Sequence, residues 1–212
     1  LTSFILENGL GVALEGFTNS QTEILEAVLD VIKQSNPTFT LDRIPSITGI
    51  QDRTIRAVFE DVIIPDTKKA LSFALNNLIY TDDIDTTVDT LSQQLTRSTG
   101  RQLTEVRTQL GIMGRQATAD AGEAAGLNLF YYSGPLDGLT RKFCIPLVDK
   151  VLSKTQINQL NNRSGLGSPL RSGGGYNCRH SFSPVSPGLV QAAGMKRATK
   201  ADIKEANDGA KK

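Results

Sequence analysis

Apolar residues recur at helical spacing through most of the first 125 residues. Ile24, Val28 and Ile32 lie four residues apart and predict a helix over 21–34, because this spacing places all three on one face. Ser20 opens this helix as the first residue of a capping box, in which a hydroxyl and a carboxylate three residues later satisfy free amides of the first turn. The start of the chain is therefore expected to be helical.

Further stripes of the same kind follow. They predict four helices, over 50–64, 66–78, 84–95 and 100–121. Asp66 is expected to cap the second helix, and residues 81–83 are expected to cap the third. Pro65 is expected to stop or kink the first of these, because proline lacks an amide hydrogen and its ring crowds the preceding turn. The array fits either antiparallel neighbours or one long kinked rod.

The last of these helices combines an apolar stripe with several arginines. The apolar side chains are expected to face a core and the arginines to face solvent. The inward set is Leu103, Val106, Leu110 and Met113, and the outward set is Arg101, Arg107 and Arg115.

The pattern changes at Gly126, where a run of leucine and aromatic residues typical of a strand replaces the helical stripes. Strands are predicted over 127–132, over 150–152 and from about 179 to 184, with a short helix that Thr155 caps and a glycine- and serine-rich loop over 161–175. The expected fold class is α+β, a helical N-terminal part followed by a small C-terminal module of short strands and loops. The predicted parts are a helical docking region (1–125), a compact module (126–187) and a basic tail (188–212) that is either helical around 201–206 or disordered.

Composition and charge narrow the function classes. Aromatic residues make up only 6% of the chain and tryptophan is absent, which agrees with a helix-rich protein. The apolar runs are far shorter than the roughly 20 residues that span a bilayer, so no membrane partner is expected. The first 100 residues carry 7 Lys/Arg against 14 Asp/Glu, whereas the remainder carries 16 against 8. The basic half could attract phosphate groups, or the opposite net charges of the two halves could cancel after folding.

Two short blocks contain the side chains that could bind a ligand or metal or take part in catalysis. The first contains Asp137, Thr140, Arg141 and Cys144, and the second contains Asn177, Cys178, Arg179 and His180. Asp137 is expected to accept hydrogen bonds from Thr140 and from Arg141 or Arg179, which would close the two blocks on each other as a structural clasp. The alternative is that the arginines and nearby glycine amides bind a phosphate group.

Both cysteines and the single histidine lie in these blocks. Cys144, Cys178 and His180 offer three zinc ligands, and Asp137 or Asp149 would have to supply the fourth of a structural site. The cysteines could instead form a disulfide or remain reduced and buried. A catalytic use of His180, Arg179 or Arg141 lacks a second histidine as general acid. The expectation is therefore no bound cofactor, with zinc as the alternative.

The two blocks resemble the C-terminal module of tailed-phage minor head proteins, the head-morphogenesis family. The family pattern has an Asp-x-x-Thr-Arg-x-x-Cys block, a short strand and helix, and an Asn-Cys-Arg-His or Asn-Cys-Arg-Cys block. The resemblance covers about 100–184. This chain departs from the pattern after Cys144, where many members have a second cysteine or a histidine, and the departure weakens the zinc alternative.

The resemblance implies a structural virion protein, assembled in the host bacterial cytoplasm, that acts at the inner capsid, the portal or the head-to-tail connection. It implies several copies bound to portal, major capsid or connector proteins, with packaged DNA near the basic C-terminal half. Some relatives of this module are joined to toxin domains. A nuclease-like or phosphate-handling enzyme carried in the phage head is therefore the second hypothesis.

Overall fold

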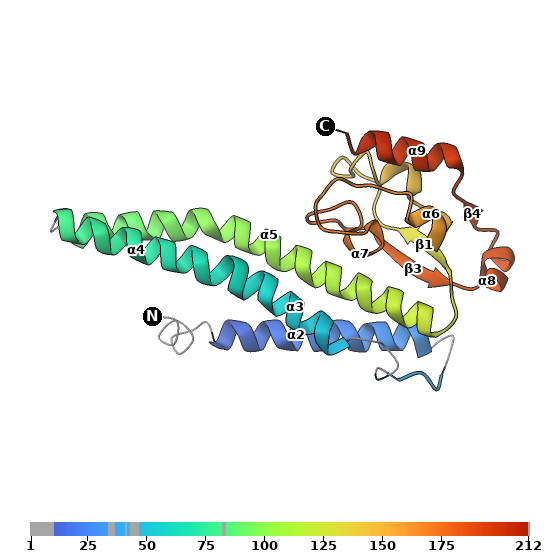
Figure 1. The fold of residues 1–212 in the computed structure, drawn as a ribbon, viewed down its shortest axis with the longest axis horizontal. Coiled ribbons are helices and arrows are strands. Elements are labelled where there is room, and N and C mark those ends of the chain that lie inside the picture. Colours follow the sequence, from blue (N-terminus) through green and yellow to red (C-terminus); the bar gives the residue numbers. More distant parts are fainter. Residues whose placement is uncertain (1–10, 34–36, 41, 43–46, 82–83, 212) are drawn as a thin grey trace.

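A computed structural model describes residues 11–33, 37–40, 42, 47–81 and 84–211 (Figure 1). Helices make up 63% of it, and the strands form a single small mixed sheet near the C-terminus, which confirms the α+β class. In the described part of the chain, no helix combines the length and the apolar character that crossing a membrane requires.

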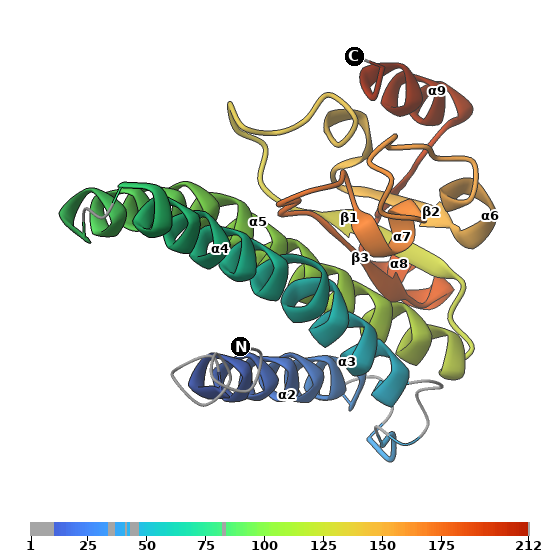
Figure 2. The same ribbon diagram turned by 60° about the vertical axis from the view of Figure 1, so that its left-hand side comes forward.

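The N-terminal part consists of long helices packed along one another. They are α2 (Gly11–Lys33), α3 (Ile47–Ile55), the π-helix η3 (Arg56–Ile63), α4 (Ile64–Thr81) and α5 (Ile84–Ala124). α4 and α5 form an antiparallel hairpin whose far end projects away from the rest, and α2 lies beside the other half of α5 (Figures 1 and 2). Both predicted arrangements are present. α3, η3 and α4 form one continuous rod, and this rod packs against α5 as an antiparallel neighbour.

Several helix boundaries differ from the predictions. α2 begins at Gly11, and the predicted capping box is wrong because the Ser20 hydroxyl lies inside the helix and donates to the Gly16 carbonyl at 3.0 Å. No break separates 84–95 from 100–121, since α5 runs through Gly100 without interruption. Part of the predicted cap at 81–83 lies outside the described residues.

Pro65 does not stop its helix. The preceding turn is the π-helix η3, in which the Ile64 amide donates to the Phe59 carbonyl five residues back. This wider turn changes which carbonyl faces the proline ring, so the clash expected in an α-helix is avoided. The predicted cap at Asp66 is consequently wrong. Asp66 lies in the first turn of α4 and pairs with Arg101 of α5 at 3.2 Å.

The C-terminal module is built on a four-stranded sheet. Its strands are β1 (Leu129–Ser133), β2 (Lys150–Ser153), β3 (Ser181–Val185) and β4 (Lys196–Arg197), in the order β3-β1-β2-β4. β1 pairs antiparallel with β2 and β3, and β4 pairs parallel with β2. The three predicted strands are confirmed within a few residues, whereas the two-residue β4 was not expected.

Short helices complete the module. They are η4 (Ile145–Leu147), α6 (Lys154–Ile157), α7 (Pro169–Ser172), α8 (Pro187–Ala192) and α9 (Lys200–Gly209). The predicted Thr155 cap is wrong, because Ser153 caps α6 through a capping box with Gln156. α9 confirms the helical alternative for 201–206, and its Ile203 and Ala206 are buried in the same core as the sheet. The segment predicted as a tail is thus folded onto the module.

α5 connects the two parts. Its Met113, Ala117 and Ala121 pack with α2 and α3 residues in one core, and its Ala119 belongs to the core of the module. Gly122 meets the sheet so closely that a Cβ there would lie 2.4 Å from the Pro184 ring. Leu103, predicted to face inward, is instead exposed. One end of α5 therefore serves as the platform on which the functional blocks are mounted.

Candidate functional site

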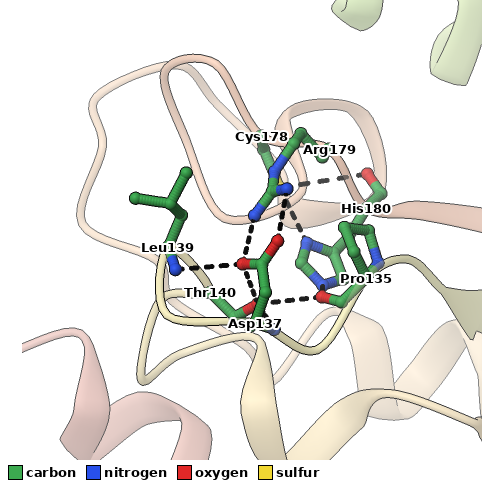
Figure 3. A network of polar contacts seen from close by, with 7 residues as sticks. All are labelled: Pro135, Asp137, Leu139, Thr140, Cys178, Arg179 and His180. Atoms are coloured by element: carbon green, nitrogen blue, oxygen red, sulfur yellow. Dashed lines mark hydrogen bonds and ion pairs between the residues drawn. The ribbon is translucent and has the colours of Figure 1, made fainter.

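The two blocks meet just beyond the end of β1 and before the start of β3. Asp137 accepts two hydrogen bonds from the Arg179 guanidinium, at 2.7 and 2.6 Å, and a third from the Leu139 amide at 2.9 Å (Figure 3). The Thr140 hydroxyl lies 3.2 Å from the same carboxylate and 2.8 Å from the Pro135 carbonyl. Of the two arginines considered for this pair, the structure places Arg179 on Asp137.

This ion pair changes the titration of its carboxyl group. The hydrogen bonds from Arg179, followed by those from Leu139 and Thr140, hold the pKa of Asp137 far below its usual range. Asp137 in turn raises the pKa of Arg179. Both side chains are partly exposed, so the pair closes the outer edge of the module and leaves no free guanidinium there to bind a phosphate group.

Arg141 and Asn177 fasten the blocks in two further places. The Arg141 guanidinium donates to the Tyr176 carbonyl, which ties the first block to the second. Asn177 has a positive φ of 52°, a conformation that asparagine tolerates better than most residues. The backbone amide of Asn177 donates to the Thr108 hydroxyl at 3.0 Å, so the second block is also attached to α5.

Cys144, Cys178 and His180 lie side by side beneath this ion pair. Their sulfur atoms and one ring nitrogen all lie within 4.8 Å of one another. His180 Nε2 is 2.9 Å from the Pro135 carbonyl, so this nitrogen carries the proton and Nδ1, 3.8 Å from Cys178 Sγ, presents a lone pair. The structure thus brings together all three soft ligands noted in the sequence.

Each sulfur atom has a hydrogen-bond donor of its own. The Tyr132 hydroxyl donates to Cys144 Sγ at 3.3 Å, and the Gly174 amide donates to Cys178 Sγ at 3.0 Å. The hydrogen bond from Cys144 is the main reason that the pKa of Cys178 is lowered, and the same bond raises the pKa of Cys144. Burial raises the pKa of Tyr132, which keeps its hydroxyl protonated as a donor. Cys178 is therefore the first of the two to become a thiolate.

The glycines around this cluster are required by close approach. A Cβ on Gly174 would lie 2.5 Å from Cys144 Sγ, and a Cβ on Gly134 would lie 2.4 Å from the His180 ring. Both distances are shorter than any real contact permits. The glycine run that the sequence displayed is thus explained in part by the packing of the sulfur atoms against bare backbone.

The sequence prediction missed Arg115 as a member of the site. It was expected to face solvent, but it is only 7% exposed and donates to three carbonyls: those of Arg171 at 2.5 Å, Cys178 at 3.3 Å and His180 at 3.4 Å. Burial lowers its pKa. Gly111 was the available signal, because a Cβ there would lie 3.2 Å from the guanidinium and its absence leaves room for the side chain.

The proposed fourth ligands and catalytic groups are held elsewhere. Asp137 is engaged by Arg179, and Asp149 accepts a hydrogen bond from the Tyr131 hydroxyl at 2.6 Å. The two cysteines are both free thiols. His180 is 3% exposed, with Nε2 committed to a carbonyl, which is a poor position for a general acid or base that must reach a polymeric substrate.

A basic hollow opens on the other side of Gly174. This cavity of about 690 Å³ is lined by Gly174 and Gly175 and by four cationic side chains: Arg141, Lys142, Arg163 and Lys211. A second cavity of about 430 Å³ shares the last two and adds Lys200 and Lys204, with Asp208 as its acidic member. The two cavities form a continuous basic face over α9 and the neighbouring loops.

Searches of protein-family models, curated proteins and solved structures gave no significant match for this chain. The function is consequently argued from the chemistry and geometry of the blocks, the helical projection and the basic face.

Proposed function

We propose that the protein is a structural component of a tailed-bacteriophage particle, a minor capsid or head-morphogenesis protein at the inner capsid surface or at the portal and head-to-tail connection. The observation that carries the proposal is that the charged and polar side chains of the two blocks bind one another and the backbone of the module. Arg179 is bound to Asp137, Arg141 to a backbone carbonyl and His180 to another. Residues that would act on a substrate in an enzyme here hold the module shut.

The α4–α5 hairpin is the part proposed to dock on other virion proteins, either the portal, the major capsid protein or a connector protein. It extends well beyond the module (Figure 1), and it carries large apolar side chains in solvent, including Phe73 (44% exposed), Val88 (57%) and Leu103. The proposal assigns these side chains to the surface that a partner covers. Several copies would bind around a symmetric partner.

The basic face over α9 is proposed to lie toward packaged DNA. Its cations are Arg141, Lys142, Arg163, Lys200, Lys204 and Lys211, and Lys211 pairs with Asp208, which lines the second cavity. A cluster of this kind neutralises backbone phosphates without reading base sequence. The acidic N-terminal part is separated from it and remains free for protein partners.

The test is to locate the chain in purified particles. Quantitative mass spectrometry of DNA-filled heads, empty heads and tails is expected to find the chain in heads at a fixed ratio to the portal protein. Its absence from purified heads, with the protein present in the infected-cell lysate, would overturn the proposal.

A matched pair of variants tests the docking role of the hairpin. Val88→Asp places a charge in the exposed apolar surface of α5 and is expected to reduce incorporation into heads, while the circular dichroism of the free protein stays unchanged. Gln93→Asp places the same charge at an exposed polar position about 140° away around the same helix and should leave incorporation intact. Equal incorporation of the two variants would argue against docking through this surface.

The second candidate is a nuclease-like or phosphate-handling enzyme carried in the head. The basic cavity beside Arg141 favours it, since such a cavity could hold a phosphate group. His180→Ala and Arg179→Ala separate the two functions. Loss of an RNase or DNase activity with the fold intact would support the enzyme, whereas loss of solubility or of head assembly, with no activity in the parent protein, would support the structural role.

A further inference from the structure

The donor set of Cys144, Cys178 and His180 suits a zinc ion. In tetrahedral zinc sites with Zn–S bonds of about 2.3 Å and Zn–N bonds of about 2.0–2.1 Å, neighbouring donor atoms lie roughly 3.3–3.8 Å apart. Cys178 Sγ and His180 Nδ1 are 3.8 Å apart, and all three donors lie within 4.8 Å of one another. The cluster needs only a small contraction to reach zinc distances.

The groups around the cluster already prepare each ligand for a metal. The Pro135 carbonyl accepts the Nε2 proton of His180 and so leaves Nδ1 as a lone-pair donor, the usual arrangement for a metal-bound histidine. The Tyr132 hydroxyl and the Gly174 amide each donate to one sulfur atom. Hydrogen bonds of this kind favour the thiolate form, which is the form that binds metals.

Ligand type and charge favour zinc over other divalent ions. Thiolate sulfur and imidazole nitrogen are ligands for zinc, whereas magnesium and calcium prefer oxygen. Two thiolates neutralise one divalent ion, so the loaded site would bring no net charge into the buried region around Cys144 and His180.

The fourth coordination position has no ligand from the described part of the chain, because Asp137 and Asp149 are bound elsewhere. Gly174 separates the two sulfur atoms from the basic cavity. A Cβ at this residue would lie 2.5 Å from Cys144 Sγ and 3.4 Å from Cys178 Sγ, and the same residue lines the cavity. The sulfur atoms fill the space that a side chain at Gly174 would need, so only this backbone lies between the cluster and the cavity.

We propose that Cys144, Cys178 and His180 bind one zinc ion, whose fourth ligand is water or a small anion. The proposal does not depend on the virion role. Zinc sites with three protein ligands commonly hold water in the fourth position.

Cobalt(II) titration of the reduced, chelator-treated full-length protein tests the site directly. One equivalent is expected to produce thiolate-to-cobalt charge transfer and tetrahedral ligand-field absorption, and zinc should displace both. Bound metal should also protect the two cysteines from alkylation. A titration without charge transfer, with thiols that react equally fast in the presence and absence of metal, would overturn the proposal without recourse to any variant.

Variants then assign the ligands. Cys144→Ser, Cys178→Ser and His180→Gln should each weaken cobalt binding by well over the roughly 10-fold loss typical when a supporting hydrogen bond is removed. Asp149→Asn is the control and should bind cobalt as the parent protein does, because Asp149 accepts its hydrogen bond from Tyr131 outside the cluster. Loss of the cobalt spectrum in this control would identify Asp149 as a fourth protein ligand and overturn the proposal that water or a small anion takes that position.

Discussion

Arg115 is the residue on which the second block rests. Its buried guanidinium fills the space left by Gly111 and donates to the carbonyls of Arg171, Cys178 and His180. Arginine suits this role because its planar fork holds several donors in fixed directions and stays charged after partial desolvation. The side chain thus fixes the backbone that presents two of the three soft ligands.

Replacing Arg115 is expected to destabilise the whole module. Arg115→Met keeps much of the volume but leaves one buried and two partly buried carbonyls without their donor, so the free energy of unfolding should fall by about 3 kcal/mol. Arg115→Lys should recover only part of this loss, because an ammonium cannot reproduce the fork. The control is Arg107→Met, an exposed arginine on the same helix. Urea denaturation that finds equal losses for Arg115→Met and Arg107→Met would refute this role.

Asp137 makes stability depend on pH in acid. Arg179 lowers the pKa of Asp137 in the folded protein, whereas an unfolded aspartate titrates near about 3.9. The carboxylate therefore stabilises the fold above the unfolded value, and this contribution is lost as the pH falls through it toward the lower folded value. The urea midpoint of the parent protein should drop more between pH 7 and pH 3 than that of Asp137→Asn. Asp89→Asn, at an exposed position of α5, should follow the parent curve.

The sequence predicted which residues belong to the site better than it predicted their partners. Soft ligands and charged groups concentrated in two short blocks pointed to Asp137, Cys144, Cys178 and His180. The sequence does not show whether Arg179 or Arg141 pairs with Asp137, because either arginine could reach the carboxylate. Only the positions of the loops in the fold decide between them. Arg115 was assigned to solvent because its partners are carbonyls more than 50 residues away, which no local pattern reveals.

At the scale of elements, stripe patterns found the helices and strands but misplaced where they end. Two helices were predicted over 84–95 and 100–121, yet a single glycine in a helix costs only about 1 kcal/mol, and α5 continues through Gly100 along the neighbouring α4. Pro65 resembled a stop, yet the π-turn of η3 accommodates its ring. Tertiary packing decides such boundaries, so the sequence could give the elements and only approximate ends.

α9 is the element whose role changed most between sequence and structure. It begins with a capping box between Thr199 and Asp202, and Asp202 also pairs with Lys150 of β2 at 2.6 Å. Ile203 and Ala206 complete the core of the module beneath it. A segment expected to be a polar tail therefore closes one side of the sheet.

Truncating Ile203 is expected to measure this contribution. Ile203→Ala removes buried methyl groups and should lower the free energy of unfolding by about 2–4 kcal/mol. Lys204→Ala changes the next residue, which is exposed, and should shift stability by no more than about 0.5 kcal/mol. Thermal or urea unfolding of both variants provides the comparison. A small effect of Ile203→Ala would mean that α9 is only loosely attached in solution.

At the scale of the whole molecule, charge is divided along the fold. Acidic residues exceed basic ones in the first 100 residues, with α2 and η3 among the acidic helices, and basic residues gather on the module around α9 and the loops beside it. Such a division orients a molecule between a protein shell and a polyanion, since each end repels the partner of the other. The two ends can therefore be tested separately.

Salt dependence provides the test of the basic end. If the face over α9 binds duplex DNA, the logarithm of affinity should fall linearly with the logarithm of salt concentration, by about 0.9 for each phosphate neutralised. Arg163→Gln combined with Lys204→Gln removes two cations from this face and should reduce that slope by about 2. The matched control, Arg56→Gln with Lys69→Gln, removes one arginine from η3 and one lysine from α4 and should leave the slope unchanged. Fluorescence anisotropy with a random-sequence duplex measures both. Binding indifferent to salt, or equal slopes for the two double variants, would remove DNA as the partner of this face and leave the protein shell as the only one proposed.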